Sequence, residues 1–173
     1  MSWPLQVTTE SPRATKAVAA RLAPLCARGD VVLLIGDLGA GKTAFAQGFA
    51  AALGVEGPVT SPTFALVRHY DCGGGGPVET LIHADVYRTG SVGEVVDLAL
   101  AELVEEKAVA LVEWGDLAAP ALGDSALEVT LEVPPSPAPA ETRRLTITGR
   151  GTWAGRAVEV AAALARVTGA VSP

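Results

Sequence analysis

The chain has 173 residues, of which 49% are hydrophobic and 18% are charged, a composition typical of one globular domain with a sizeable core. Its net charge of −6, from 13 Lys and Arg against 19 Asp and Glu, argues against a dedicated nucleic-acid-binding surface. The sequence has no apolar run near the ~20 residues that span a bilayer and no secretory signal, so we predict a single cytoplasmic domain over residues 1–173 that binds no membrane.

The first elements read as a short strand followed by a helix. Residues 3–8 form a candidate edge strand. Ser11 and Pro12 predict a helix start, because serine caps free N–H groups and proline suits the first helical turn. We expect Pro24 to kink or shorten this helix before Gly29 ends the segment.

The strongest motif follows a run of five apolar residues, Val31–Ile35, that predicts a buried strand. Residues 36–43 read GDLGAGKT, which is the P-loop pattern G-x-x-x-x-G-K-[ST], and an apolar helical pattern follows. The glycines let successive N–H groups point at phosphate oxygens, and the helix adds the positive end of its dipole. Lys42 would then reach the β- and γ-phosphates, and the Thr43 hydroxyl would ligate Mg²⁺. The sequence therefore predicts a nucleoside triphosphate with Mg²⁺ as the ligand.

The rest of the chain alternates between strand and helix patterns. The expected elements are strands at residues 63–70, 78–84 and 108–112, a helix over 91–104, paired strands at 126–133 and 143–149, and a helix over 154–167. The uniformly apolar strands are typical of a parallel sheet that is buried on both faces. We predict an α/β fold: a three-layer P-loop NTPase-like domain with a mixed, largely parallel sheet, flanking helices and a C-terminal β-hairpin.

Two carboxylates end apolar strands after the P-loop. Asp85 ends LIHAD and Glu113 ends AVALVE, and ligands of open α/β sheets lie at the carboxyl ends of the strands. One carboxylate can bind the metal while the other orients the attacking water. His83 either positions Asp85 or a water, or is a structural hydrogen-bonding residue. Trp114 either stacks on a base or packs against the strand.

The motifs that are present and missing indicate which nucleotide the chain binds and which reaction it catalyses. No N-K-x-D segment for reading guanine is present, which favours ATP over GTP. A small-molecule kinase is the alternative class, but such enzymes usually carry an arginine-rich lid, and only Arg68 and Arg88 lie between the P-loop and Glu113. Four arginines near the C-terminus are the one candidate for a local basic patch: Arg143, Arg144, Arg150 and Arg156.

The motifs together resemble a known family. GDLGAGKTAFAQGF, SPTF, HADVYR and LVEW are similar, in this order, to the signatures of the bacterial TsaE (YjeE) family of small P-loop ATPases. The resemblance runs from about Ser11 to Trp114. Thr89 stands where the family usually has Leu, and Ala99 where a Gly is common. These two departures concern a docking surface rather than the nucleotide chemistry.

The resemblance implies an activity, partners and site residues. The chain would be a Mg²⁺-dependent ATPase, slow by itself, that acts with TsaD and TsaB in threonylcarbamoyl-adenosine modification at position 37 of tRNAs reading ANN codons. It would meet tRNA only through that complex. Asp85 would serve hydrolysis, Thr43 and Glu113 would ligate Mg²⁺, and Thr15 would lie by the adenine. Ser61 to Thr63 would act as a switch near the γ-phosphate. The residues that would hold ATP at the P-loop are Gly39, Ala40, Gly41, Lys42, Thr43 and Ala44.

Overall fold

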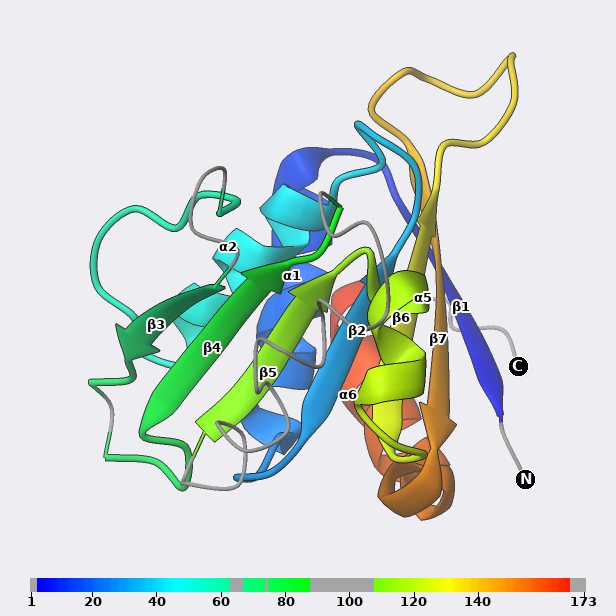
Figure 1. Cartoon of the computed structure of the whole chain (residues 1–173). Helices are drawn as coiled ribbons and strands as arrows, with labels where there is room; N and C mark the ends of the chain where they lie inside the picture. The colour runs from blue at the N-terminus through cyan, green and yellow to red at the C-terminus, as the bar shows by residue number, and fades with distance from the viewer. Residues whose placement is uncertain (1–2, 63–66, 74, 88–107, 169–173) are drawn as a thin grey trace.

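The computed structural model describes residues 3–62, 67–73, 75–87 and 108–168, whose strands form one mixed seven-stranded sheet with helices on both faces (Figure 1). The strands are β1 (Pro4–Thr9), β2 (Val31–Ile35), β3 (Val67–Asp71), β4 (Thr80–Asp85), β5 (Ala108–Glu113), β6 (Ala126–Glu132) and β7 (Arg143–Arg150). The α-helices are α1 (Pro12–Leu22), α2 (Lys42–Ala52), α5 (Gly115–Ala118) and α6 (Ala157–Thr168), and the 3₁₀ turns are η1 (Ala23–Leu25), η2 (Ala119–Ala121) and η3 (Gly151–Arg156). The predicted helix over 91–104 and the first half of the strand at 63–70 lie outside the described residues.

The sheet has the strand order β1-β7-β6-β2-β5-β4-β3. Its four central strands, β6, β2, β5 and β4, are parallel, while β6 and β7 form an antiparallel hairpin to which β1 adds as an antiparallel edge. The predicted fold class is therefore confirmed. The order places the P-loop strand β2 between β5 and β6, so its carboxyl end lies at the centre of the sheet.

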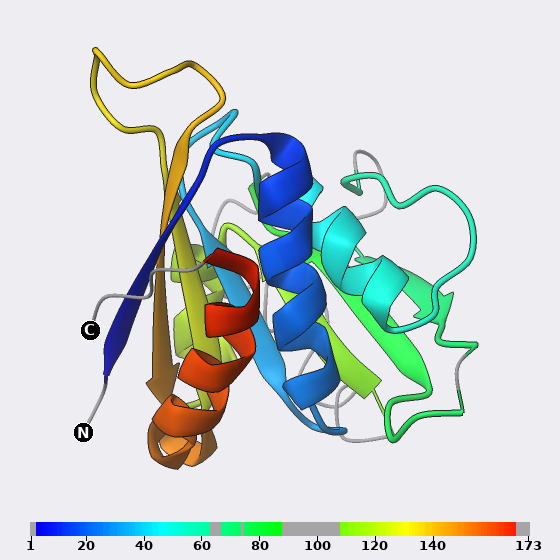
Figure 2. The same ribbon diagram turned by 180° about the vertical axis from the view of Figure 1, so that it is seen from behind.

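The helices of the described ranges cover the two faces of the sheet unequally. Figure 2 shows α1, α2 and α6 side by side over one face, while the short α5 lies on the other face in Figure 1. All six side chains of β5 are buried, as expected for a central parallel strand covered on both sides. By contrast, β1 alternates between exposed and buried residues, as an edge strand with one face on the core does. No helix within the described ranges has the length and apolar character that crossing a membrane requires.

The sequence signals around α1 are confirmed. The Ser11 hydroxyl accepts a hydrogen bond of 3.2 Å from the Ala14 N–H at the helix start. The α-helix ends at Leu22, and the 3₁₀ turn that follows contains Pro24, whose ring cannot fit inside a regular helix.

The backbones of helices α1 and α2 come into direct contact at Gly48, which has no side chain to hold them apart. A Cβ at this position would lie 2.3 Å from the Lys16 carbonyl oxygen and 2.6 Å from its Cα, and neither atom can turn aside. We expect Gly48→Ala to destabilise the fold by about 2 kcal/mol and to lower Tm by ~6 °C. Thermal melting measures this, with Gly155→Ala as the control, because nothing lies within 4 Å of a Cβ there. Equal melting of the two variants would contradict this packing.

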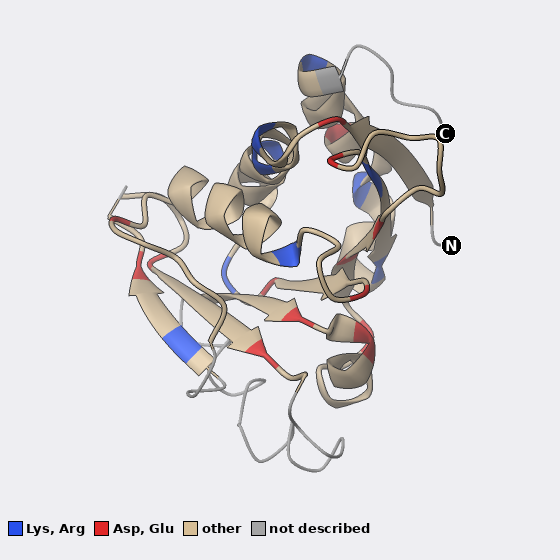
Figure 3. Ribbon diagram, turned by 90° about the horizontal axis from the view of Figure 1, so that it is seen from above, with Lys and Arg blue, Asp and Glu red and all other residues tan. Residues whose placement is uncertain are grey.

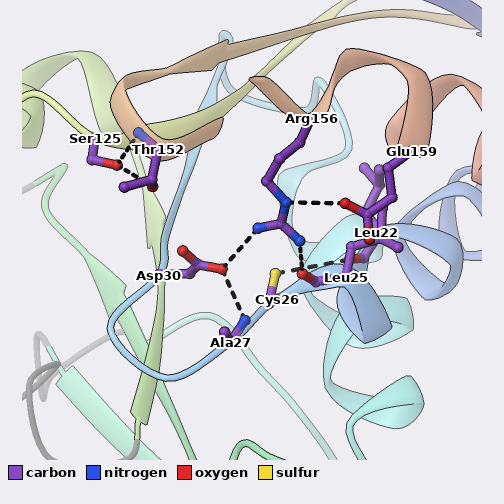
Figure 4. Close-up of polar contacts among 9 residues, drawn as sticks. All are labelled: Leu22, Leu25, Cys26, Ala27, Asp30, Ser125, Thr152, Arg156 and Glu159. Atoms are coloured by element: carbon purple, nitrogen blue, oxygen red, sulfur yellow. Dashed lines mark hydrogen bonds and ion pairs between the residues drawn. The ribbon is translucent and has the colours of Figure 1, made fainter. Parts of the chain in front are cut away.

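Two of the C-terminal arginines have structural partners. Arg156 donates to the Asp30 carboxylate at 3.3 Å and to the Leu25 carbonyl (Figure 4). Its guanidinium also lies 3.8 Å from the centre of the Trp153 ring. These contacts tie η3 to the chain between α1 and β2. Arg150 pairs with Glu128 of the neighbouring strand at 2.8 Å. The candidate basic patch therefore loses two of its four members to ion pairs.

Candidate functional site

A pocket of about 410 Å³ lies at the carboxyl ends of the central parallel strands. The view of this end of the sheet in Figure 3 shows acidic residues at the tips of neighbouring strands. The residues that line the pocket are Leu38, Gly39, Gly41, Lys42, Thr43, Ser61, Asp85, Tyr87, Glu113 and Trp114. The fold thus brings the P-loop and the two carboxylates into one pocket, as the strand-end positions of Asp85 and Glu113 predicted.

The P-loop needs its glycines for their backbone conformation. Gly39 has a φ of 79° and Gly41 a φ of 105°, values that side-chain-bearing residues rarely adopt. Between them, the Ala40 N–H donates to the Asp37 carbonyl at 3.1 Å and closes a tight turn. Gly41 then caps α2, which begins at Lys42. The positive end of this helix therefore faces the pocket. Ala40 and Ala44 belong to the loop and helix but do not line the pocket.

The Lys42 ammonium lies inside the site. Its Nζ donates to the Gly36 carbonyl at 2.5 Å and to the Asp37 carbonyl at 2.9 Å, and it lies 3.9 Å from the centre of the Trp114 ring. Burial lowers the pKa of Lys42, and the negative charges around it oppose this effect. These charges belong to Glu113, Asp85, Asp37 and Asp116.

Glu113 is held by a histidine of the neighbouring strand. Its side chain is 4% exposed, and its Oε1 lies 2.9 Å from Nε2 of the fully buried His83. A carboxylate only accepts hydrogen bonds, so the proton of this bond lies on Nε2. Nδ1 of His83 has no hydrogen-bond partner among the described residues. Of the roles left open for His83, the structure shows a structural hydrogen bond, which reaches diagonally across the pleated sheet to Glu113 and not to Asp85. This bond leaves the other oxygen of the Glu113 carboxylate for a ligand.

Asp85 is oriented through both of its oxygens. The Ser61 hydroxyl donates to Oδ2 at 2.6 Å, and the Tyr87 N–H donates to Oδ1 at 3.0 Å. Asp85 is paired with Glu113 in the register of β4 and β5, so the two carboxylates extend from adjacent positions at one edge of the sheet. Ser61 therefore links the predicted switch segment to the predicted hydrolytic carboxylate. Thr63, the last residue of that segment, lies outside the described residues.

Trp114 has an unusual backbone conformation. Among the described residues it is the one non-glycine with a positive φ, 60°, which costs free energy for a bulky side chain. This conformation lets the ring lie beside Lys42 and at 4.5 Å, centre to centre, from the ring of Tyr87. The residue both packs and lines the pocket.

Thr15 is the predicted site residue that the structure places elsewhere. Its side chain is buried, and its Oγ1 lies 2.8 Å from Oγ1 of Thr9 and donates to the Ser11 carbonyl at 3.3 Å. The hydroxyl thus joins β1 to α1 and does not line the pocket. Contact between this residue and adenine stays a prediction. Of the two arginines between the P-loop and Glu113, Arg68 donates to the Thr60 hydroxyl at 3.3 Å, and Arg88 lies outside the described residues.

The contact of one arginine with the P-loop escaped the sequence analysis. Arg143, the first residue of β7, donates through Nε to the Ala40 carbonyl at 3.0 Å and through Nη2 to the Gly39 carbonyl at 3.1 Å. The sequence offered only a group of arginines near the C-terminus, and no spacing rule connects residues about a hundred positions apart.

The side chains of the pocket suit a magnesium-bound triphosphate by their chemistry. Mg²⁺ prefers oxygen ligands and keeps several from water and phosphate, and the Thr43 hydroxyl with Glu113 and Asp85 offers oxygen alone. In the described part of the chain no group of three or more His, Cys, Asp or Glu forms a metal cage of its own. Lys42 and the open glycine turns add the positive charge and free space that phosphates require.

Comparison with known proteins decides the family. The family model described as "Threonylcarbamoyl adenosine biosynthesis protein TsaE" matches residues 9–142. The chain belongs to the TsaE family. The match covers every residue that lines the pocket and ends one position before Arg143.

Curated relatives named "tRNA threonylcarbamoyladenosine biosynthesis protein TsaE" extend this result. The TsaE of Streptomyces coelicolor is 40% identical over 82% of this chain and 95% of its own length. The TsaE of Bacillus subtilis is 41% identical over 74% of this chain and 77% of its own length. The crystal structure of YdiB from Bacillus subtilis superposes with a TM-score of 0.72 at 32% identity, covering 96% of this chain and 97% of that one. The TsaE-family fold therefore extends over nearly the whole chain.

Proposed function

We propose that this chain is the ATP-binding and ATP-hydrolysing component of tRNA threonylcarbamoyladenosine biosynthesis, serving position 37 of tRNAs that read ANN codons. The observation that carries the proposal is that Lys42, Thr43, Asp85 and Glu113 line one pocket in a member of the TsaE family. The names of the relatives favour this function over a stand-alone small-molecule kinase.

The side chains would divide the chemistry as follows. Lys42 would exchange the two carbonyls it now contacts for phosphate oxygens, because a hydrogen bond to a charged group is stronger. Thr43 and Glu113 would hold Mg²⁺, which neutralises the charge that develops on the phosphates. Asp85 would orient the attacking water. Through its hydrogen bond to Ser61, the conformation of the predicted switch segment would depend on whether the γ-phosphate is bound.

The partners in this proposal are homologues of TsaD and TsaB, and the chain would meet tRNA only through them. Phosphoryl transfer needs positive charge around the γ-phosphate, and Lys42 is the one Lys or Arg among the described residues that line the pocket. A partner can supply a further cation. Because the chain carries a net charge of −6, it should dock on a basic surface in the cytoplasm, and added salt should weaken the complex.

ATP turnover with and without partners tests this function. We expect slow turnover by the isolated chain and an increase of at least about tenfold with TsaB and TsaD homologues, since a cation supplied in trans accelerates such reactions strongly. Thr43→Ala in the same mixture should abolish the increase and serves as the control for contaminating ATPases. Fast turnover without partners, or transfer of labelled phosphate to a small acceptor, would favour the kinase.

A further inference from the structure

Arg143 makes four hydrogen bonds, all to backbone carbonyls. Two lead to the P-loop at Gly39 and Ala40, and two of 2.8 Å lead from Nη1 to Ala140 and Thr142 in the connection before β7. All three nitrogens of the guanidinium are thus used. The side chain joins the β6–β7 hairpin to the P-loop.

The bond to Ala40 controls the direction of the next N–H. A peptide unit is planar and trans, so the carbonyl of one residue and the N–H of the next point in opposite directions. With the Ala40 carbonyl held by Arg143, the Gly41 N–H points away from β7. Gly41 lines the pocket and Arg143 does not. Arg143 therefore lies on the side of the loop that faces away from the pocket. Its bond to the Ala40 carbonyl directs the Gly41 N–H away from the arginine and toward the side where the phosphates would bind.

The loop needs such support because of its composition. Gly39 and Gly41 flank Ala40, and glycine has the largest conformational freedom to lose when a loop is ordered. A donor that is held in place before the ligand arrives lowers the entropy cost of binding. Arginine suits this task because its planar fork reaches two carbonyls at once, whereas the lysine ammonium is a point donor on a flexible stem.

We propose that Arg143 is a positioning residue of the nucleotide site, which holds the Ala40–Gly41 peptide with its N–H directed at the phosphates. It acts from outside the pocket and outside the region matched by the family model. The inference rests on the proposed ATP site, but its structural half concerns the P-loop alone. It also removes a third arginine from the candidate basic patch.

Two variants and a matched control test the proposal. Arg143→Gln removes the fork, Arg143→Lys keeps the charge but not the fork, and Arg144→Gln changes the adjacent, exposed arginine. Backbone ¹⁵N order parameters of Gly39, Ala40 and Gly41 in the protein without nucleotide report on the loop itself. Calorimetry reports the affinity for Mg·ATP, and thermal melting checks the fold.

We expect both Arg143 variants to lower the order parameters of the three loop residues from ~0.85 toward 0.6 and to weaken Mg·ATP binding roughly tenfold, with melting nearly unchanged. Arg144→Gln should resemble the wild type in all three measurements. Unchanged order parameters in Arg143→Gln, or full recovery by Arg143→Lys, would overturn the proposal. If the wild type bound no ATP, the proposed function would fail, and the order parameters would still decide whether Arg143 holds the loop.

Discussion

Lys42→Ala should reduce the affinity for Mg·ATP by about a hundredfold or more, or about 2.7 kcal/mol, while the protein remains folded. The ammonium is the one Lys or Arg charge among the described residues that line the pocket, and no neighbouring side chain there can take over its contact with the phosphates. In the fold it contacts two loop carbonyls and one aromatic ring, so its removal should change Tm by only a few degrees, at about 1 kcal/mol.

Calorimetry with Mg·ATP and thermal melting check this prediction together. Lys16→Ala is the matched control, because it removes an exposed lysine from α1. Retained ATP affinity in Lys42→Ala would contradict the assignment of the site. A large fall in Tm would contradict the view that Lys42 serves binding rather than folding.

The second large effect concerns the two carboxylates, which we expect to fail in different ways. Asp85→Asn should slow hydrolysis by about 10²–10³-fold and leave Mg·ATP affinity near normal, because it removes the group that we propose orients the attacking water. Asparagine fits the site: its oxygen can face the Tyr87 N–H while its amide donates to the Ser61 hydroxyl. Glu113→Gln should instead weaken Mg²⁺-dependent binding by about 10–100-fold, since it removes the proposed Mg²⁺ ligand.

Titration of ATP at several Mg²⁺ concentrations, followed by single-turnover hydrolysis in the presence of partners, separates the two effects. Asp116→Asn is the control. Asp116 lies at an exposed position of α5, and its substitution also removes one negative charge that acts on Lys42. Equal losses of binding and turnover in the two test variants would contradict the division of roles between Asp85 and Glu113.

Signals within a few residues of one another predicted the local structure well. The apolar run of β2, the glycine pattern after it and the Ser11 cap all describe short stretches whose conformation depends on their own side chains. The strand ends at Asp85 and Glu113 could be predicted for the same reason. Because ligands lie at the carboxyl ends of parallel strands, these strand ends predicted that the two carboxylates lie close to the P-loop.

Contacts between distant parts of the chain were the ones that sequence reasoning missed. His83 bonds to a residue 30 positions away, and Arg143 to residues 103 and 104 positions away. Each of these pairs depends on which strands are neighbours and on which face of the sheet a side chain lies, and periodicity along the chain contains neither.

The sequence by itself therefore determined the α/β class, the P-loop at residues 36–43, and the two carboxylates that line one pocket with it. Only the tertiary structure decided that β6 lies beside β2, that His83 holds Glu113 rather than Asp85, and that Arg143 supports the P-loop. The physical reason is that local conformation follows from propensity and capping over a few residues. Partners across the sheet are instead selected by the packing of the whole chain, in which burial of the core sets the strand order.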